Sequence, residues 1–260
     1  MTYLAGIDIG AASSKAVIIE DRKVVSSHLI PSGGDYCFSA GKVMKEALIK
    51  KNLSIKDVKK IVATGGGAGS VPFPSTVISD ITCHGRAVSF LRPSVRTVVD
   101  IGDLFSRAFR LGPDGKVSFF VLSGKCAGGS GKILQVIARV LNVELSEIGK
   151  LSLKSENRVD FNSGCAVFME TEAVSRIAEG AAREDLLNGV HHALSSQIFS
   201  LAERVGLEKD YALVGGGANN QGLIRAFEEE VGDKVFIPEN SRLTAAFGAA
   251  LIAWDTMEKG

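Results

Sequence analysis

Two stretches of the chain share one pattern: Asp8-Ile9-Gly10-Ala11-Ala12-Ser13-Ser14-Lys15-Ala16 and Asp100-Ile101-Gly102-Asp103-Leu104-Phe105-Ser106-Arg107-Ala108. Each follows one apolar run and leads into another, which predicts a β-hairpin whose tight turn carries Asp and Gly. One copy alone would be explained as an ordinary hairpin, but two copies in matching settings favour a duplicated domain. We therefore predict two lobes with a cleft between them, where both turns face one ligand.

The two turns have the chemistry of a phosphate site. Gly10 and Gly102 let the backbone come close to a phosphate group, and backbone amides donate hydrogen bonds to its oxygens. Asp8 and Asp100 can hold Mg²⁺ directly or through water, and Asp100 can alternatively hold the attacking water. Lys15 is a suitable cation for β- or γ-phosphate oxygens. The predicted catalytic residues are therefore Asp8, Asp100 and Lys15.

Composition limits the classes of function. The 260 residues carry a net charge of +1, with 45% hydrophobic and 23% charged residues, which is ordinary for a soluble globular protein. The charge pattern gives no indication of nucleic acid or an anionic membrane as partner, and the longest apolar window, residues 243–254, is too short to span a bilayer. Four cysteines do not make a disulfide framework. We expect a cytoplasmic protein whose cysteines are core residues or ligands, with Cys37 buried.

Apolar periodicity predicts strands before helices in both halves, which is the order of an α/β fold. The first lobe is expected over residues 1–93, with a helix at about Ser39–Lys50 and another from Asp80 to Leu91. The second lobe is expected over residues 94–241. A helix from Arg242 onward is expected to pack back across the first lobe, so that residues 242–260 complete it.

A third turn, Gly215-Gly216-Gly217-Ala218-Asn219-Asn220, lies between a predicted buried strand and a helix. It can present backbone amides and a surface without side chains to a nucleoside, although many α/β proteins have such a turn. Together the three turns predict a nucleotide site. Its cofactor-binding residues are Gly10, Ser13, Ser14, Gly102, Gly215, Gly216, Gly217 and Asn219.

The two hairpins, the late glycine turn and a helix of small residues at 244–250 resemble the actin, sugar-kinase and heat-shock-protein ATPase superfamily over nearly the whole chain. The resemblance implies an α/β, two-lobed actin-like (ribonuclease H-like) ATPase fold, with duplicated βββαβα lobes around a nucleotide cleft. The run from Gly124 to Lys132 is not a Walker-type phosphate loop, because Cys126 and Ile133 stand where that motif needs Gly and Ser or Thr.

Two cysteines each precede a predicted helix: Cys126 before Ala127-Gly128-Gly129-Ser130-Gly131, and Cys165 after Asn162-Ser163-Gly164. A helix N-terminus favours a thiolate and any anionic cluster that it holds. Two thiols cannot complete a four-cysteine iron–sulfur site, but a symmetric dimer can, if each protomer gives both. For an arbitrary pair of cysteines, two small buried residues would be the better interpretation.

The runs Lys125–Gly131 and Cys165–Phe168, together with Cys83-His84, resemble the BadF/BadG/BcrA/BcrD ATPase family. That family contains activators of 2-hydroxyacyl-CoA dehydratases and ATPase subunits of benzoyl-CoA reductases. The resemblance implies a homodimer, or a heterodimer with a paralogous subunit, that shares one [4Fe–4S] cluster held by Cys126 and Cys165. It also implies ATP or ADP with Mg²⁺ at the nucleotide site. ATP would drive a low-potential electron from ferredoxin or flavodoxin, through the cluster, to an acyl-CoA reductase or dehydratase.

One departure from the family pattern lies in the second hairpin. Activator-type members carry Gly-Gly-Gln-Asp after the second Asp-Ile, whereas this chain has Gly102-Asp103-Leu104-Phe105. A Gln there can orient attacking water, and Leu104 cannot. The D-type subunits of benzoyl-CoA reductases depart similarly, so the chain resembles that branch more closely. We expect slow ATP hydrolysis beside a more typical partner subunit, unless Asp103 or Arg107 compensates.

Two other functions remain open. A small-molecule kinase of the same superfamily would need a catalytic base and a substrate pocket in the first lobe, and it would leave Cys126 and Cys165 without a role. A non-hydrolysing nucleotide-binding subunit fits the loss of the Gln and Asp after Gly102. Bound iron separates electron transfer from the kinase, and turnover of ATP separates it from the non-hydrolysing subunit.

Overall fold

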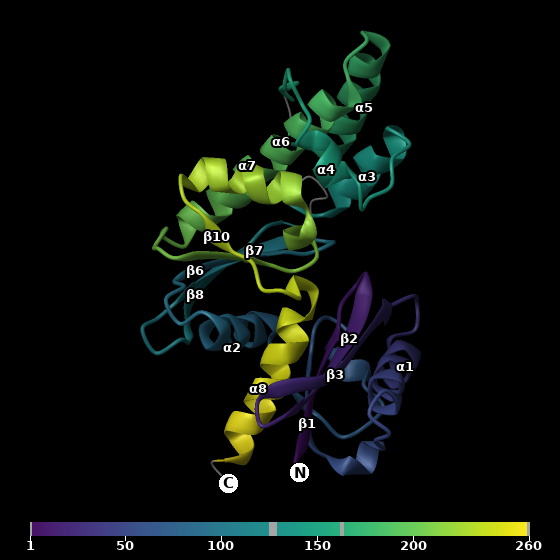
Figure 1. Ribbon diagram of the computed structural model, residues 1–260, viewed down its shortest axis with the longest axis vertical. Helices are drawn as coiled ribbons and strands as arrows, with labels where there is room; N and C mark the ends of the chain where they lie inside the picture. Colours follow the sequence, from purple (N-terminus) through teal and green to yellow (C-terminus); the bar gives the residue numbers. More distant parts are fainter. Residues whose placement is uncertain (1, 125–128, 162–163, 259–260) are drawn as a thin grey trace. The chain divides into compact units, whose positions relative to one another are not determined.

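Strands open both halves of the chain, and helices follow them. The computed structural model describes residues 2–124, 129–161 and 164–258 (Figure 1). The chain divides into two compact units. The first comprises Met1–Ser94, Leu111–Val117 and Arg242–Gly260, and the second comprises Val95–Arg110 and Ser118–Ser241.

The first unit is built on a five-stranded sheet in the order β3-β2-β1-β4-β5. β1 pairs antiparallel with β2 and parallel with β4, so the first hairpin and the strand after α1 share one sheet. The elements are β1 (Tyr3–Ile9), β2 (Ser13–Glu20), β3 (Lys23–Pro31), α1 (Tyr36–Ile49), β4 (Val58–Thr64), β5 (Thr76–Val77), α2 (Asp80–Leu91) and α8 (Thr244–Met257).

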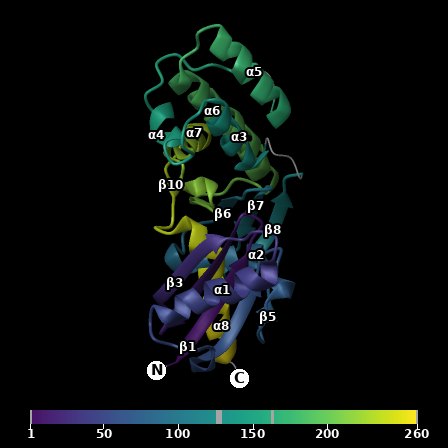
Figure 2. The same cartoon turned by 90° about the vertical axis from the view of Figure 1, so that its right-hand side faces the viewer.

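Helices cover both faces of this first sheet, with α1 on one side and α8 on the other (Figure 2). Alternate residues of β1 therefore enter different cores: Ile7 packs in one with Val43 of α1, and Leu4 in the other with Ala250 of α8. A Cβ at Gly6 would overlap the backbone of α8. The absence of a side chain thus lets α8 lie directly on β1.

The second unit repeats this sheet with the order β10-β9-β6-β7-β8. In each sheet the first strand pairs antiparallel with the next strand of the chain on one side and parallel with a later strand on the other. These pairs are β1 with β2 and β4 in the first unit, and β6 with β7 and β9 in the second. The elements are β6 (Thr97–Ile101), β7 (Ser106–Leu111), β8 (Val117–Leu122), α3 (Lys132–Val140), α4 (Ile148–Ser152), α5 (Ala166–Ala178), α6 (Arg183–Arg204), β9 (Tyr211–Val214), α7 (Gln221–Val231) and β10 (Val235–Phe236).

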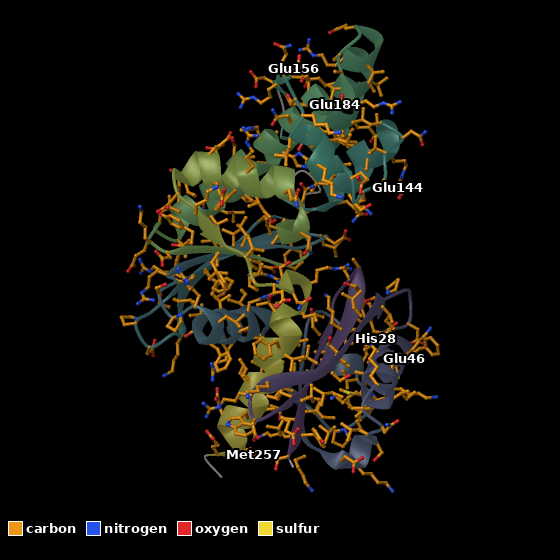
Figure 3. All side chains as sticks on the ribbon, viewed as in Figure 1. His28, Glu46, Glu144, Glu156, Glu184 and Met257 are labelled. Carbon is orange, nitrogen blue, oxygen red and sulfur yellow. The ribbon has the colours of Figure 1, made fainter. Side chains whose placement is uncertain are left out.

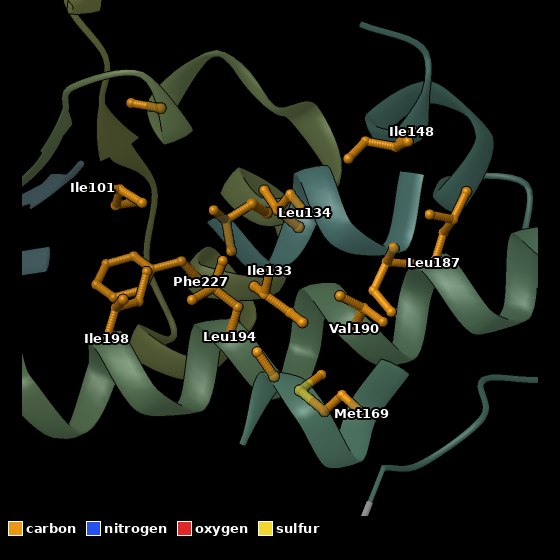
Figure 4. Close-up of a cluster of buried hydrophobic side chains, with 14 of the residues drawn as sticks. Ile101, Ile133, Leu134, Ile148, Met169, Leu187, Val190, Leu194, Ile198 and Phe227 are labelled. Atoms are coloured by element: carbon orange, nitrogen blue, oxygen red, sulfur yellow. The ribbon is translucent and has the colours of Figure 1, made fainter. Parts of the chain in front are cut away.

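One apolar core joins the helices of the second unit to its sheet (Figure 4). Leu187, Val190, Leu194 and Ile198 follow one another at helical spacing along α6, so one face of this helix is buried. They pack with residues of α3, α5 and α7 and with Ile101 of β6. The packing fixes β6, which ends at the second Asp-Ile-Gly turn.

The predicted α/β architecture with strands first in each half is confirmed. The predicted helix at Asp80–Leu91 is α2, while α1 begins three residues before its predicted start, because the Asp35 side chain accepts a hydrogen bond from the Phe38 amide and caps the helix at 2.9 Å. The prediction that Cys37 is buried was wrong. It is exposed in the first turn of α1.

Charged side chains lie on the outside of both units. Glu46 projects from α1, and the exposed Glu144 and Glu156 lie among the helices of the second unit (Figure 3). Within the described ranges, no helix is both long enough and apolar enough to cross a membrane.

Candidate functional site: two matched hairpins and a cysteine at a helix start

The first hairpin holds a buried ion pair. Asp8 is the penultimate residue of β1 and lies opposite Lys15 of β2 in the antiparallel register. The Lys15 Nζ donates to Asp8 Oδ2 at 2.9 Å, and Asp8 is only 7% exposed. The turn closes through the Gly10 amide, which donates to the Ser13 carbonyl at 3.1 Å. A lysine and a carboxylate thus stand side by side next to the turn.

Two serine hydroxyls hold the first turn through hydrogen bonds. The Ser14 and Ser32 hydroxyls are 2.8 Å apart and share a hydrogen bond, and the Ser32 hydroxyl donates to the Gly10 carbonyl at 2.6 Å. Ser13 and Ser14 are both buried. Ser14, which the sequence predicted together with Ser13 as a cofactor-binding residue, is therefore hydrogen-bonded beside the turn.

The second hairpin repeats the pair with arginine in place of lysine. Asp100 lies opposite Arg107 in the same register, and Arg107 Nη1 donates to Asp100 Oδ2 at 2.6 Å. The Asp100 side chain is 5% exposed and that of Arg107 is 14% exposed. The Arg107 guanidinium also lies 4.5 Å from the centroid of the Phe105 ring. Charge, stacking and burial together hold Arg107 in one position.

A glycine with a positive φ contacts each aspartate. Gly65 follows β4 with φ +86°, and Gly215 follows β9 with φ +83°. A Cβ at Gly65 would overlap Asp8 Oδ1 and lie 2.6 Å from the Ile9 carbonyl oxygen, while one at Gly215 would overlap Asp100 Oδ1 and lie 2.8 Å from the Ile101 carbonyl oxygen. Only glycine fits both the backbone angle and the space.

The sequence prediction included Gly215 but missed Gly65 as its counterpart. The signal was present, because Gly65-Gly66-Gly67 follows a buried strand just as Gly215-Gly216-Gly217 does. Gly67 also donates from its amide to the Ile9 carbonyl at 2.9 Å. Each unit therefore has one hairpin turn and one glycine turn packed on the same aspartate.

Of the other predicted residues of the glycine turn, Gly217 and Asn219 lie on a short 3₁₀ helix, Gly217–Asn219, and Gly216 directly precedes it. Asn219 is exposed, and its Nδ2 donates to the Gly216 carbonyl at 3.3 Å. Its neighbour Asn220 caps α7 by accepting a hydrogen bond from the Leu223 amide at 3.1 Å. The turn thus leads into a helix N-terminus, a place in a fold that favours anions.

The buried thiol of Cys83 lies close enough to Asp8 to be affected by its charge. Cys83 of α2 is fully buried, and burial raises its pKa to about 12, with the negative charge of Asp8 adding to the effect. The thiol is therefore neutral at physiological pH, which makes it a poor nucleophile and a poor metal ligand.

The two predicted metal ligands are Cys126 and Cys165. Cys126 lies outside the described residues. Cys165 is half-buried and is the N-cap of α5, and its side chain makes no capping hydrogen bond to that helix. Among the described residues no group of three or more His, Cys, Asp or Glu side chains is arranged to hold a metal ion. A single soft thiolate donor at a helix start fits a site completed by other thiolates.

Within the first unit, Asp8, Gly10 and Lys15 lie together, and within the second unit Asp100 and Gly102 lie with Gly215 and Gly217. Arg107 is the partner of Asp100 that the sequence named only as a compensating residue.

Known proteins resemble this chain over nearly its whole length. The family model described as the BadF/BadG/BcrA/BcrD ATPase family matches residues 5–253. The 2-hydroxyisocaproyl-CoA dehydratase activator of Clostridioides difficile is 36% identical over 97% of this chain and 95% of its own. The D-type subunit of benzoyl-CoA reductase from Thauera aromatica is 31% identical over 96% of this chain and 93% of its own.

Solved structures show the same fold. The activator of the 2-hydroxyisocaproyl-CoA dehydratase from Clostridium difficile, solved with bound ADPNP, superposes with a TM-score of 0.95 and covers 99% of this chain and 96% of its own, at 36% identity. A glucokinase of the ROK family from Streptomyces griseus, at 11% identity, reaches a TM-score of 0.61 over 97% of this chain and 99% of its own. This distant likeness confirms the actin-like, sugar-kinase fold alone. The chain belongs to the BadF/BadG/BcrA/BcrD ATPase family.

Proposed function

We propose that this protein is an iron–sulfur ATPase that couples ATP binding and hydrolysis to electron transfer into an acyl-CoA dehydratase or reductase. The observation that carries the proposal is the matched pair of buried aspartates, each joined to a cation and packed on a glycine turn. In a family of dehydratase activators and reductase subunits, this arrangement supports nucleotide chemistry rather than two structural hairpins.

The two hairpins have matching roles in the proposed nucleotide site. The Lys15 and Arg107 cations attract phosphate oxygens, and the turn amides donate hydrogen bonds to them. Asp8 and Asp100 hold Mg²⁺ directly or through its water ligands. Since each aspartate is paired with its own cation, the carboxylates are held in position before the nucleotide arrives.

Asp103 is proposed to take the place of the Gln that the second turn lacks. Leu104 is 51% exposed and has no polar atom, so it cannot orient water. The Asp103 Oδ1 accepts a hydrogen bond from Gln135 of α3, and Gln135 in turn accepts one from Lys132 Nζ at 3.1 Å. A carboxylate fixed in this way keeps Oδ2 as an acceptor for the attacking water.

Cys126 and Cys165 are the proposed ligands of a [4Fe–4S] cluster shared by two protomers, either identical or paralogous. When bound, the cluster supplies a one-electron carrier of low potential. This chain supplies two thiolates, and the N-terminus of α5 favours the negative charge at Cys165. The electron acceptor is a component that either dehydrates a 2-hydroxyacyl-CoA or reduces an aromatic acyl-CoA. The electron donor is ferredoxin or flavodoxin.

A second candidate is a nucleotide-binding subunit that does not hydrolyse ATP. The exposed Leu104 in the second turn favours it. ATP turnover distinguishes the two candidates. An ATPase rate that depends on Asp103 supports the hydrolysing ATPase. ATP binding without turnover, in the presence of a paralogous partner, supports the non-hydrolysing subunit.

The first test is the content of iron and acid-labile sulfide in protein purified without oxygen, with visible and EPR spectra. One shared [4Fe–4S] cluster requires about two irons per chain. We expect Cys126→Ala and Cys165→Ala to lose them, and Cys37→Ala, at an exposed thiol of α1, to keep them. Protein that stays iron-free even after co-expression with a paralogous subunit and cluster reconstitution, yet binds ATP, would contradict the electron-transfer proposal.

A further inference from the structure

One glutamine of α6 lies between Gly164, which precedes Cys165, and Gly129, which follows Cys126 by three residues in the sequence. The Gln197 Nε2 donates to the Gly164 carbonyl at 2.9 Å, directly before Cys165. On the other segment, a Cβ at Gly129 would lie 3.2 Å from Gln197 Oε1. The two ends of one carboxamide thus face the two segments.

Both facing positions are glycines, and the glutamine gives a reason for this. A Cβ at Gly164 would overlap Nε2 of Gln197. A Cβ at Gly129 would come so close to Oε1 of Gln197 that the glutamine side chain would have to shift. A side chain at either position would therefore have to displace the carboxamide from its present place.

The segment around Gly129 is also fixed from its other side. The hydroxyl of the buried Ser106 on β7 donates to the Gly129 carbonyl at 2.7 Å. The Gly131 amide donates to the Gly102 carbonyl at 2.8 Å. Gly129 is thereby held against the second hairpin, and the Gln197 carboxamide lies between it and Gly164.

We propose that Gln197 is a positioning residue: it sets the spacing between Gly129 and Gly164 within one protomer, and so acts on the chain that leads to each predicted ligand cysteine. The inference rests on the proposed function, because it assigns the spacing to two thiolates of one cluster. Hydrogen-bonded groups behind metal ligands orient them, and their loss typically weakens metal binding. Gln197 acts through the backbone that leads to each ligand.

Two substitutions separate the roles of the carboxamide. Gln197→Met keeps the length that separates Gly129 from Gly164 but cannot donate to the Gly164 carbonyl. Gln197→Ala loses both the side-chain length and the hydrogen-bond donor. The matched control is Ser196→Ala, one residue earlier on α6, where the hydroxyl bonds to Glu230 of α7.

The first measurement needs no iron. Nitroxide labels are attached to Cys126 and Cys165 in the full-length Cys37→Ser chain, diluted with unlabelled chain, and the distance between labels is measured by pulsed EPR. We expect a narrow distribution with native Gln197 and with Ser196→Ala. Gln197→Ala should broaden the distribution and Gln197→Met should shift it. Identical distributions in all four proteins would overturn the inference.

The second measurement uses reconstituted protein. We expect Gln197→Ala to lose iron to a chelator about tenfold faster than the native chain. Gln197→Met should retain its iron but show altered EPR g values and midpoint potential. Unchanged spectra, potential and iron loss in both variants would overturn the inference. An iron-free native chain whose label distance still depends on Gln197 would instead contradict the proposed function, and leave the spacing role supported.

Discussion

The two hairpins have the same frame but different attachments. In the first, the Gly10 carbonyl accepts from the Ser32 hydroxyl, and Ser14 bonds to that same serine. In the second, the equivalent Gly102 carbonyl accepts from the Gly131 amide, and Ser106, which stands in the place of Ser14, donates to Gly129. Both turns are thus joined to the segment between the third strand and the first helix of their unit, through a side chain in the first hairpin and through the backbone in the second.

That connecting segment differs in length between the units. In the first unit only residues 32–35 connect β3 to α1, whereas in the second residues 123–131 connect β8 to α3. The longer connection contains Cys126. The duplicated frame thus serves two purposes: one copy positions a turn, and the other positions a turn together with a segment that carries a predicted metal ligand.

The largest expected effect tests whether the frame is truly the same. Gly65→Ala and Gly215→Ala each place a Cβ against an aspartate and a backbone carbonyl at positive φ. Each should lower the free energy of unfolding by about 3 kcal/mol, as measured by urea denaturation. Gly66→Ala and Gly216→Ala meet no atom within 4 Å and serve as controls. A large loss in only one unit would break the equivalence.

The next effect concerns the two ion pairs. Lys15→Met and Arg107→Met each leave a buried carboxylate without its cation and remove a charge that binds phosphate. We expect each to lower the ATPase rate about 100-fold, measured as phosphate release. Lys116→Met, at a side chain that is 84% exposed, should have no effect.

Exchange of the cations sharpens the same comparison. Arg107→Lys recreates the first pair in the second hairpin and should retain most of the rate lost in Arg107→Met. If Arg107→Lys is as slow as Arg107→Met, then the stacking of the Arg107 guanidinium on Phe105 is essential to the second hairpin.

Acid should destabilise the second unit through one buried histidine. Burial on α6, with the positive charge of His192 adding, lowers the pKa of His191 to about 3 from 6.5. The unfolded chain therefore binds a proton that the folded chain does not. The stability from neutral His191 is complete above pH 6.5 and is lost as the pH falls towards 3. The slope is about 1.4 kcal/mol per pH unit.

Urea midpoints between about pH 6.5 and 5 measure this slope above the range in which most carboxylates titrate. His191→Leu should flatten the pH dependence. His192→Gln is the comparison: burial also lowers the pKa of His192, but this side chain is only partly buried and pairs with Glu229 at 3.3 Å, so its loss should flatten the pH dependence less than His191→Leu. An unchanged slope in His191→Leu would show that His191 is not the group responsible.

The smallest effect separates the two attachments. Ser14→Ala and Ser106→Ala each remove one buried hydrogen bond and should cost about 1 kcal/mol of stability. Of the two, Ser106→Ala should also speed the loss of iron to a chelator, because Ser106 bonds to the Cys126 segment through Gly129. Equal iron loss in both variants would mean that the second hairpin does not hold that segment.

Much of the fold follows from local sequence. Apolar runs in β1 and β6, glycine-rich turns after β4 and β9, and the helical spacing of apolar residues in α6 predict the elements and their order. The short β5 and α4 carry no such signal, because two to five residues give too short a pattern to show a period. The exposure of Cys37 depends on which face of α1 meets the sheet, and two aromatic neighbours misled the prediction.

The site was predicted in part. The paired aspartates and Lys15 were found because the motif is repeated. Gly65 was not assigned, although its glycine run repeats that of Gly215; the contact of each glycine with an aspartate is a tertiary feature that the local sequence does not show. Gln197 was invisible for the same reason: nothing in α6 itself marks it, and its role depends on two glycines brought near by the tertiary fold.

The contact between α8 and β1 has a consequence for the order in which the chain is made. The first unit is complete only when α8, late in the chain, covers the face of β1 where Gly6 leaves room for it. The second unit uses no residue after Ser241. During synthesis from the N-terminus, we expect the second unit to finish folding while β1 still exposes Leu4 and its neighbours. Until α8 emerges from the ribosome, that surface is the one a chaperone would bind.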